Sequence, residues 1–429
     1  MGGVNRTNAA AEGAGANLLA LRSHNTALVL DLLRTAGEEG ISRLELAERT
    51  GLTPQAVSKI TARLRADGLA AEAGRRASTG GKPRTVLRLV PDAGHAVGVH
   101  LDRDELRAVL VDLTGAVVAE RRAPLDLGAG SGAVVEGVAR EVAGVLGVAA
   151  GAAGAAGAAG AAGAAGAAGA AGAAGAAGAN GAAAAAGAAG ANGAAEAAGA
   201  ATGPVADVVL GVGVALPGPL DHARGVLHRV TGFPEWDGFP LRDALARRLG
   251  MPVVVDKDTN AAALGLAVGE EAGPGVGSFA YLHLGTGLGA GLVIGGGVHR
   301  GARTGAGEFG HQVVQLDGPP CTCGGRGCIE ALCLAAVAGG DLDEAARVLG
   351  AGAANLVGLL DIDLVLLGGR TIAAAPDAFV RGVTTVLDAR ARREGTPTVP
   401  VRVAPGGERG VAEGAAQLLL APLFGRAEA

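Results

Sequence analysis

Three of the four cysteines in this chain fall within one short segment, and this clustering constrains the fold more than any other feature. They are Cys321, Cys323 and Cys328, and His311 stands ten residues before the first. Three thiolates and one imidazole form the closed ligand set of a structural zinc site, and the intervening glycines let the backbone turn tightly. The alternative is unrelated buried cysteines, since free cysteine is often an inert hydrophobe. The clustering favours zinc in a loop spanning residues 311–330, with the fourth cysteine, Cys333, in the core.

Charge is distributed unevenly along the 429 residues. The net charge is −5, but residues 18–90 hold 12 basic and seven acidic residues, so this segment carries +5 and the remainder −10. A basic module on an acidic body is typical of a polyanion-binding domain. The few clustered cysteines argue against a disulfide framework, and neither a signal peptide nor a membrane-spanning run is evident. We expect a cytoplasmic protein of two or three domains without a membrane partner.

The basic segment has the signals of a winged helix-turn-helix. Residues 18–36 place leucines on one stripe of a helix, and Ser42 caps a second helix in which Glu45 completes a capping box. After a turn at Gly51, Thr53 caps a third helix that opens with Pro54. Two short helices joined by such a turn present the second one to the major groove of DNA.

Two extended pieces, residues 69–73 and 84–89, flank a loop rich in basic residues, as in a phosphate-gripping wing. The alternative to a DNA-binding domain is a small helical interaction domain whose charged residues are simply exposed to solvent. The residues expected to meet bases or phosphates are Thr53, Gln55, Ala56, Ser58, Lys59, Arg63, Arg75, Arg76, Lys82 and Arg84.

A low-complexity insertion of Gly-Ala-Ala repeats occupies residues 147–203. A glycine at every third position costs about 1 kcal/mol each relative to alanine in a helix, and the segment has no proline to support a collagen-like triple helix. We therefore predict an insertion without chemistry. The predicted domains are the winged helix-turn-helix at 18–90, the first part of a body at 95–146, the insertion at 147–203 and the remaining body at 204–429.

Apolar strand-like runs alternate with helices on both sides of the insertion, which predicts an α/β body with ligands at the carboxyl ends of strands. Glycine-rich turns after two such runs could approach an anion or a sugar hydroxyl, although many glycine turns only reverse the chain. The phosphate-loop-like residues are Gly285, Thr286, Gly287, Gly289, Gly368 and Gly369.

Polar residues near these turns are the better candidates for a site. Asp258 and Asn260 follow an apolar strand, where a carboxylate could act as a base towards a hydroxyl. Glu308 lies three residues before His311, and Glu330 lies two after Cys328. The metal loop would therefore hold two carboxylates beside one histidine, although each acid alone could be a solvated surface group.

These motifs resemble the ROK family (repressor, open reading frame, kinase) over nearly the whole chain outside the insertion. The resemblance is carried by Pro217-Gly218, the segment from Asp258 to Ala262, the turn at Gly285, the segment from Gly307 to His311, and above all the cysteine motif. It implies an actin-like, two-lobed body of the sugar-kinase and ribonuclease H-like type, preceded by the winged helix of the repressor branch. It also implies a zinc bound by His311, Cys321, Cys323 and Cys328, a catalytic-base position at Asp258, and sugar contacts from Asp258, Asn260, Glu308, His311 and Glu330.

Two positions depart from the family pattern. Family kinases carry an Asp-x-Gly-Gly-Thr phosphate turn after the first strand, whereas this chain has His100, Asp102 and Asp104 there, without glycine. The added carboxylates would repel phosphate unless a metal intervened. Lys257 stands where the family usually has asparagine. ATP and Mg²⁺ are therefore not expected as cofactors.

The sequence predicts a sugar-responsive regulator, a repressor that binds operator DNA as a homodimer or homotetramer, with a structural zinc and no kinase activity. One alternative is an active sugar kinase with an appended DNA-binding domain, acting on a hexose or amino sugar. Another is a DNA-binding scaffold whose sugar pocket no longer binds a ligand.

Overall fold

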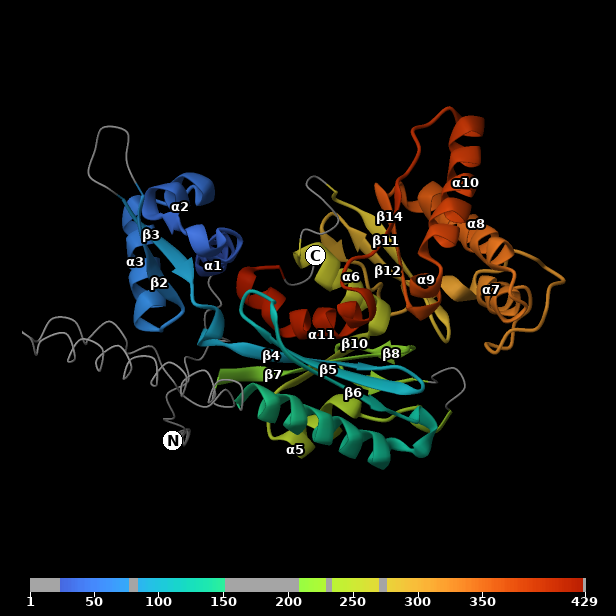
Figure 1. Ribbon diagram of the computed structural model, residues 1–429, viewed down its shortest axis with the longest axis horizontal. Coiled ribbons are helices and arrows are strands. Elements are labelled where there is room, and N and C mark those ends of the chain that lie inside the picture. Colours follow the sequence, from blue (N-terminus) through green and yellow to red (C-terminus); the bar gives the residue numbers. More distant parts are fainter. Residues whose placement is uncertain (1–23, 77–83, 151–207, 229–233, 270–275, 427–429) are drawn as a thin grey trace, which may run out of the picture.

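The computed structural model describes residues 24–76, 84–150, 208–228, 234–269 and 276–426. The N-terminal unit, blue in Figure 1, is a three-helix domain with a small antiparallel sheet in the order β1-β3-β2. The first part of the predicted helix at 18–36, Lys82 and most of the insertion lie outside the described residues. The elements of this domain are α1 His24–Thr35, β1 Ile41–Ser42, α2 Arg43–Thr50, α3 Pro54–Ala66, β2 Ala70–Arg76 and β3 Arg84–Leu89.

Local hydrogen bonds confirm the predicted helix starts in this domain. The Glu45 amide donates to Ser42 Oγ at 3.3 Å, and the Ser42 amide donates to Glu45 Oε2 at 2.8 Å, which closes the capping box. Thr53 Oγ1 accepts from the Ala56 amide at 3.3 Å, with Pro54 as the first helical residue. Gly51 ends α2 with φ of 70°, a left-handed conformation that glycine adopts without strain.

The first lobe of the body is a five-stranded sheet in the order β10-β7-β4-β5-β6. Strands β4, β5 and β6 form an antiparallel meander, and β7 and β10 add in parallel beside β4. A helix over residues 131–150 and α5 pack on one face, seen below the sheet in Figure 1. The elements are β4 His95–Leu101, β5 Glu105–Asp112, β6 Val117–Pro124, β7 Val209–Leu216, α5 Leu241–Leu249 and β10 Val253–Lys257.

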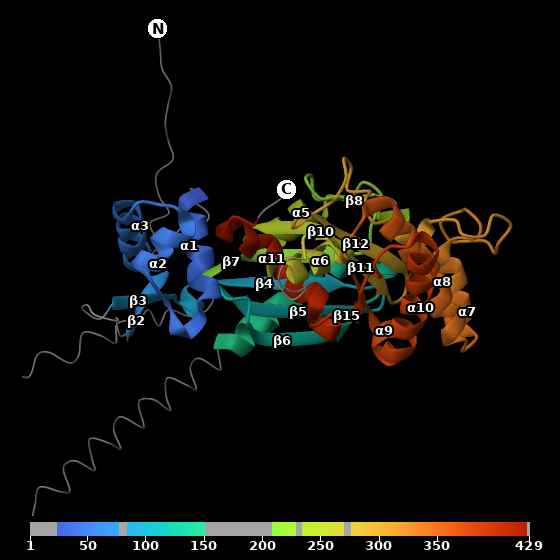
Figure 2. The same ribbon diagram turned by 90° about the horizontal axis from the view of Figure 1, so that it is seen from above.

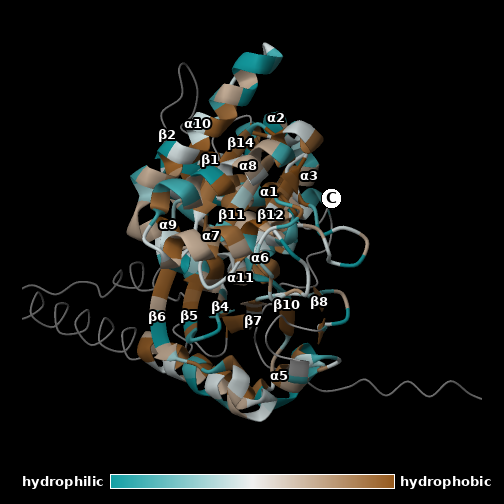
Figure 3. Ribbon diagram, turned by 90° about the vertical axis from the view of Figure 1, so that its right-hand side faces the viewer, coloured by the Kyte–Doolittle hydropathy of each residue, from teal (hydrophilic) through white to brown (hydrophobic). Residues whose placement is uncertain are grey.

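The second lobe repeats this strand arrangement in the order β13-β12-β11-β14-β15. Helices α7, α8, α9 and α10 cover its outer face. In Figure 3 the central strands of both lobes are largely hydrophobic in colour, as expected for sheets covered on both faces. The elements are β11 Phe279–Leu284, β12 Leu288–Ile294, β13 Gly297–Val298, η7 Phe309–His311, α7 Ile329–Ala338, α8 Leu342–Leu360, β14 Leu364–Gly368, α9 Arg370–Ala374, α10 Pro376–Glu394 and β15 Val401–Val403.

Two helices, α6 Asp258–Val268 and α11 Gly410–Leu420, lie between the two sheets (Figure 1). Their backbones approach so closely that a Cβ on Gly414 would lie 2.0 Å from the Ala261 carbonyl oxygen. This two-lobed architecture confirms the predicted actin-like body. Figures 1 and 2 place the winged helix at one end of the molecule and α7 and α8 at the other.

The glycine-rich turn after β11 is shorter than the sequence predicts. Strand β12 begins at Leu288, so Gly289 and Gly291 belong to the strand. Their missing side chains make room for α6, because a Cβ on Gly291 would lie 2.1 Å from the Thr259 carbonyl oxygen. These glycines therefore serve helix–sheet packing. In the described part of the chain, no helix is long and apolar enough to cross a membrane.

Candidate functional site

A cavity of about 90 Å³ lies between the lobes, at the carboxyl ends of β4 and β10 and beside the β11–β12 turn. The chain brings four of the predicted sugar-binding residues to it from three segments. Asp258 begins α6, Glu308 precedes η7 and His311 ends it, and Glu330 lies in the first turn of α7. The turn residues Thr286 and Gly287 and the strand residue Gly289 also line it.

Asn260 does not line this cavity, contrary to the prediction. Its side chain is fully buried, and its Nδ2 donates to Asp256 Oδ1 at 2.9 Å. The reason is helical geometry: two residues along a helix turn a side chain by about 200°, so Asn260 faces away from the cavity that Asp258 lines. Asn260 instead orients Asp256, which also accepts from Arg300 Nε at 2.7 Å.

Glu330 is held rigidly at the cavity wall. Only 7% of this residue is exposed, and its Oε2 accepts a hydrogen bond from the Leu288 amide at 2.9 Å. A Cβ on Gly287 would lie 3.1 Å from the same oxygen. The second carboxylate oxygen has no protein partner of its own among the described hydrogen bonds, and it can accept from a ligand hydroxyl.

Lys257 lines the same cavity as a buried charge. Its side chain is 3% exposed, and its ammonium donates to the Ala306 carbonyl and, at 3.1 Å, to Glu308 Oε1. Gly218 makes room for it, since a Cβ there would lie 2.7 Å from Lys257 Cδ. The departure from the family asparagine therefore ties up one oxygen of Glu308.

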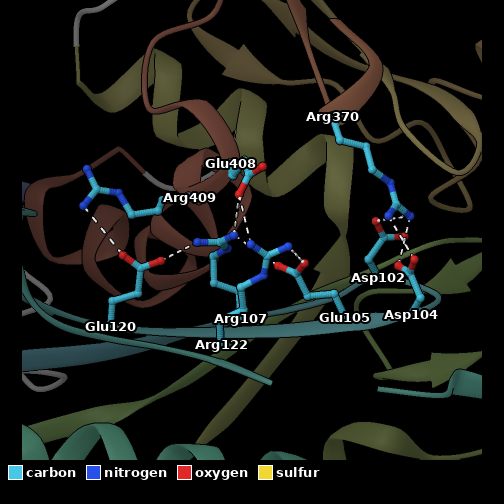
Figure 4. Close-up of polar contacts among 9 residues, drawn as sticks. All are labelled: Asp102, Asp104, Glu105, Arg107, Glu120, Arg122, Arg370, Glu408 and Arg409. Carbon is cyan, nitrogen blue, oxygen red and sulfur yellow. Dashed lines mark hydrogen bonds and ion pairs between the residues drawn. The ribbon is translucent and has the colours of Figure 1, made fainter. Parts of the chain in front are cut away.

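The altered phosphate turn is bridged by an arginine that the sequence did not reveal. Arg370, the first residue of α9, donates to both carboxylate oxygens of Asp104 at 2.9 Å and lies 3.4 Å from Asp102 (Figure 4). Asp102 also accepts from Thr286 Oγ1 at 2.9 Å and from the Arg103 amide at 2.7 Å. The hydrogen bond from Arg370 lowers the pKa of Asp104 below its ordinary value of 3.8.

This bridge changes the expected electrostatics of the turn. A guanidinium from the second lobe compensates the extra carboxylates. Arg370 directly follows Gly368 and Gly369, the predicted phosphate-loop-like pair, where Gly369 has φ of 95° and a Cβ would lie 2.4 Å from the Leu284 carbonyl oxygen. Arg370 stands next to this glycine pair in the sequence, but its pairing with Asp102 and Asp104 could not be predicted, because these two carboxylates belong to the other lobe.

A second group of ion pairs joins the first lobe to η8 Gly407–Arg409, just before α11. Arg107 is 8% exposed and contacts Glu120, Glu105 and Glu408 (Figure 4). The remaining contacts of this group are Arg122 with Glu105 and Glu408, and Arg409 with Glu120. These contacts hold η8 against β5 and β6 of the first lobe.

The four predicted metal ligands meet at one point, with their ligand atoms within 4.8 Å of one another. The sulfurs of Cys323 and Cys328 are 3.7 Å apart, and Cys321 Sγ lies 3.8 Å from His311 Nδ1. An ion about 2.3 Å from sulfur and 2.0 Å from nitrogen in tetrahedral geometry would give separations of about 3.8 and 3.5 Å. The set therefore fits a tetrahedral metal, and His311 reaches both this cluster and the cavity.

The thiols of the cluster differ in the direction of their pKa shifts. Burial and the neighbouring thiols raise the pKa of Cys328 to about 12. A hydrogen bond from the Gly325 amide, by contrast, lowers the pKa of Cys323. A bound metal would favour the thiolate form of all three and release their protons. Cys333 is buried away from the cluster, where its thiol donates to the Ala345 carbonyl at 3.5 Å.

The third helix of the N-terminal domain, α3, turns one side to the core and the other to solvent. Val57 and Leu64 are buried. The predicted DNA-contacting residues that are exposed are Thr53, Gln55, Ser58, Lys59, Arg63, Arg75 and Arg84, while Ala56 is half-buried. Arg63 lies 3.6 Å from Asp67 in an exposed pair. Arg76 ends β2, and Lys82 falls outside the described residues.

Fold and site together define a class of protein: a winged helix-turn-helix domain fused to a sugar-kinase-like body. Comparison with known sequences agrees. Residues 28–70 match the winged helix-turn-helix DNA-binding family, and residues 196–339 match the ROK family. The chain therefore contains a ROK family domain preceded by a winged helix-turn-helix domain.

Similar proteins include both regulators and kinases. A putative xylose repressor of Caldicellulosiruptor sp. is 23% identical over 82% of this chain and 84% of its own length. A glucokinase of Thermotoga maritima is 43% identical, but the match covers only 28% of this chain and 38% of the glucokinase. A solved ROK family transcriptional regulator, a homologue of the Escherichia coli Mlc protein, shares the fold over 96% of this chain and 98% of its own, with a TM-score of 0.65 and 19% identity.

Proposed function

We propose that this protein is a transcriptional repressor that binds a sugar between its lobes without phosphorylating it. The observation that carries the proposal is the contrast inside one cleft. Asp258, Glu308, His311 and Glu330 converge on one cavity, while Arg370 bridges the carboxylates of the neighbouring turn. A sugar can meet acceptors there, whereas an ATP phosphate would have to displace an arginine and approach two carboxylates.

Similarity to xylose repressors supports a pentose or hexose as the effector. Exposed residues of α3 and of the wing would bind operator DNA, Lys59 and Arg84 through phosphates and Gln55 and Ser58 near bases. A homodimer or homotetramer would pair two such domains on a palindromic site. His311, Cys321, Cys323 and Cys328 would hold a structural zinc ion, which supplies no chemistry but fixes the His311 ring and the start of α7 beside the cavity.

The proposal is tested by sugar binding, DNA binding and ATP turnover measured on one preparation. Calorimetry with D-xylose, D-glucose and N-acetyl-D-glucosamine should find one sugar that binds. That sugar should change the affinity for a duplex selected by the protein from a random-sequence pool. An operator affinity that no sugar alters would refute sensing and leave DNA binding intact.

The second candidate is an active sugar kinase, favoured by Asp258 in the base position and by the glucokinase similarity. A coupled ADP-release assay over the same sugars separates the two functions. Sugar-dependent turnover that Asp258→Asn abolishes would replace the first proposal with the second. If no sugar binds and none is phosphorylated, the cavity is a relic on a DNA-binding scaffold.

A further inference from the structure

Helix α6 connects the sugar cavity to the N-terminal domain. It begins at Asp258, which lines the cavity, and ends at Val268. At about 1.5 Å per residue its 11 residues span about 16 Å. At the far end the Val268 carbonyl accepts a hydrogen bond from Arg34 of α1 at 3.4 Å. One rigid element therefore touches both the candidate effector site and the DNA-binding domain.

Arg34 is the centre of a contact that we call the Arg34 junction, made of Asp31, Arg34, Val268, Phe424 and Arg426. Arg34 and Arg426 both pair with Asp31, at 2.8 and 2.9 Å. The Arg34 guanidinium also stacks 5.3 Å from the centre of the Phe424 ring. The side chains of Arg34 and Asp31 are only 12% and 17% exposed, so water screens this junction weakly.

The second central helix ends at the same place. Helix α11 continues into η9 Ala421–Phe424, and Arg426 follows two residues later. Both helices between the sheets therefore end at α1. The domain does not depend on this junction for attachment, because Leu30 and Leu33 of α1 share an apolar core with Leu420 and Leu423. The junction can thus set the orientation of the domain without being its anchor.

The carboxyl-terminal half of α6 has room to move. A cavity of about 420 Å³ lies along one side, lined by Gly265, Leu266 and Val268. Another of about 280 Å³ lies along the other side, lined by Leu264, Ala267 and Val268. Both pockets open to solvent, so they leave space beside this half of α6 for a small shift.

We infer that α6 transmits the effect of sugar binding from Asp258 to the N-terminal domain, and that Arg34 is the positioning residue through which this effect reaches α1. A sugar that hydrogen-bonds Asp258 biases the position of α6. The shift reaches α1 through the guanidinium of Arg34, which contacts both the Val268 carbonyl and the Phe424 ring. Effector and operator affinities are then coupled through this junction, reciprocally. This inference rests on the proposed function, since it needs a sugar that alters DNA binding.

The test compares Arg34→Met with the wild type and with Arg347→Met. Methionine keeps most of the apolar stem of arginine and removes the guanidinium. Arg347 is a matched control, since it forms an exposed helical pair with Glu344 at 2.7 Å and three residues' spacing, as Arg34 does with Asp31. The probes are D-xylose, D-glucose and N-acetyl-D-glucosamine, with a duplex that the wild type selects from a random pool.

Fluorescence anisotropy gives the duplex Kd with and without sugar, and calorimetry gives the sugar Kd. In the wild type and in Arg347→Met, sugar should change the duplex Kd on the order of 5- to 150-fold. In Arg34→Met this ratio should fall to about twofold or less, with each separate Kd within about threefold of wild type. Arg34→Lys, which keeps the charge near Asp31, should restore part of the ratio.

Each outcome decides a specific point. If no sugar alters wild-type duplex binding, the proposed function fails. If the wild type responds and Arg34→Met responds equally, only the role of Arg34 fails. Loss of all duplex binding in Arg34→Met would show a structural role and also overturn the inference. Hydrogen exchange supplies a second readout: sugar should alter protection of α1 amides in the wild type but not in Arg34→Met.

Discussion

Removal of the proposed zinc ion should strongly weaken the proposed sugar binding while DNA binding persists. Residues 312–327 contribute few buried side chains, so the four ligands His311, Cys321, Cys323 and Cys328 are the main contacts that order this loop. Helix α7 begins at the residue after Cys328. Once the cluster opens, His311 and the first turn of α7, including Glu330, lose their fixed positions beside the cavity.

The expected magnitude follows from the contacts at risk. Glu330 and His311 each offer a hydrogen bond to a sugar, worth about 1–3 kcal/mol when one partner is displaced from a buried site. Loss of both predicts sugar affinity weaker by about 30-fold or more. The core of the N-terminal domain contains no residue of the metal loop. Duplex affinity without sugar should therefore change by less than about threefold.

The assay titrates the protein with a strong chelator and follows zinc release, sugar binding by calorimetry and duplex binding by anisotropy. Added Zn²⁺ should restore sugar binding, with proton release that buffer-dependent calorimetry detects. Cys333→Ala is the control, because this buried cysteine lies outside the cluster and should leave the zinc content unchanged. Duplex binding that disappears before sugar binding would refute the reasoning.

Three further predictions concern other parts of the molecule. Arg370→Ala removes a half-exposed bridge between the lobes, so the free energy of unfolding should fall by about 0.5–1 kcal/mol in low salt. Denaturant titrations should show this difference vanish in 1 M NaCl. A loss that does not depend on salt would contradict an ionic role. Lys59→Ala and Arg84→Ala should each lower the slope of log affinity against log salt concentration for duplex binding by about one phosphate contact. Glu72→Gln, at the base of the wing, should leave this slope unchanged. Unchanged slopes in the first two variants would count against α3 and the wing as the DNA-binding face. Burial lowers the pKa of His95 below its ordinary 6.5, so the folded state binds fewer protons than the unfolded state. The free energy of unfolding should therefore decline as the pH falls below about 6.5. The melting temperature of His95→Asn should fall less steeply over this pH range, and that of the exposed control His24→Asn should follow the wild type.

Much of the fold could be predicted because its signals are local. Capping at Ser42 and Thr53 depends on side chains within three residues of a helix start, and the strands of both lobes are recorded in runs of apolar residues. The resemblance to the ROK family then supplied the pairing of these strands into two lobes. Element boundaries were least predictable: Gly289 was assigned to the glycine-rich turn but belongs to β12, which begins at Leu288.

The candidate site was predicted less evenly. Side chains in one motif, such as His311 and Glu330 around the cysteines, stay together because the loop is short. Asn260 was assigned to the cavity from its nearness to Asp258 in the sequence, but helical rotation turns it to the opposite side. Lys257 was recognisable as a departure from the family, yet its pairing with Glu308 depends on how residues 306–308 pass beside α6.

The sequence by itself determined the modules, the helix caps and the four-ligand cluster, since each follows from residues only a few positions apart. Only the tertiary structure decided which charges neutralise one another across the molecule. Arg370 reaches Asp104 over 266 positions, and Arg34 reaches the end of α6 over 234. Such pairs form because two lobes and a third domain pack around α6 and α11, and no local pattern records which side chains that packing brings within reach.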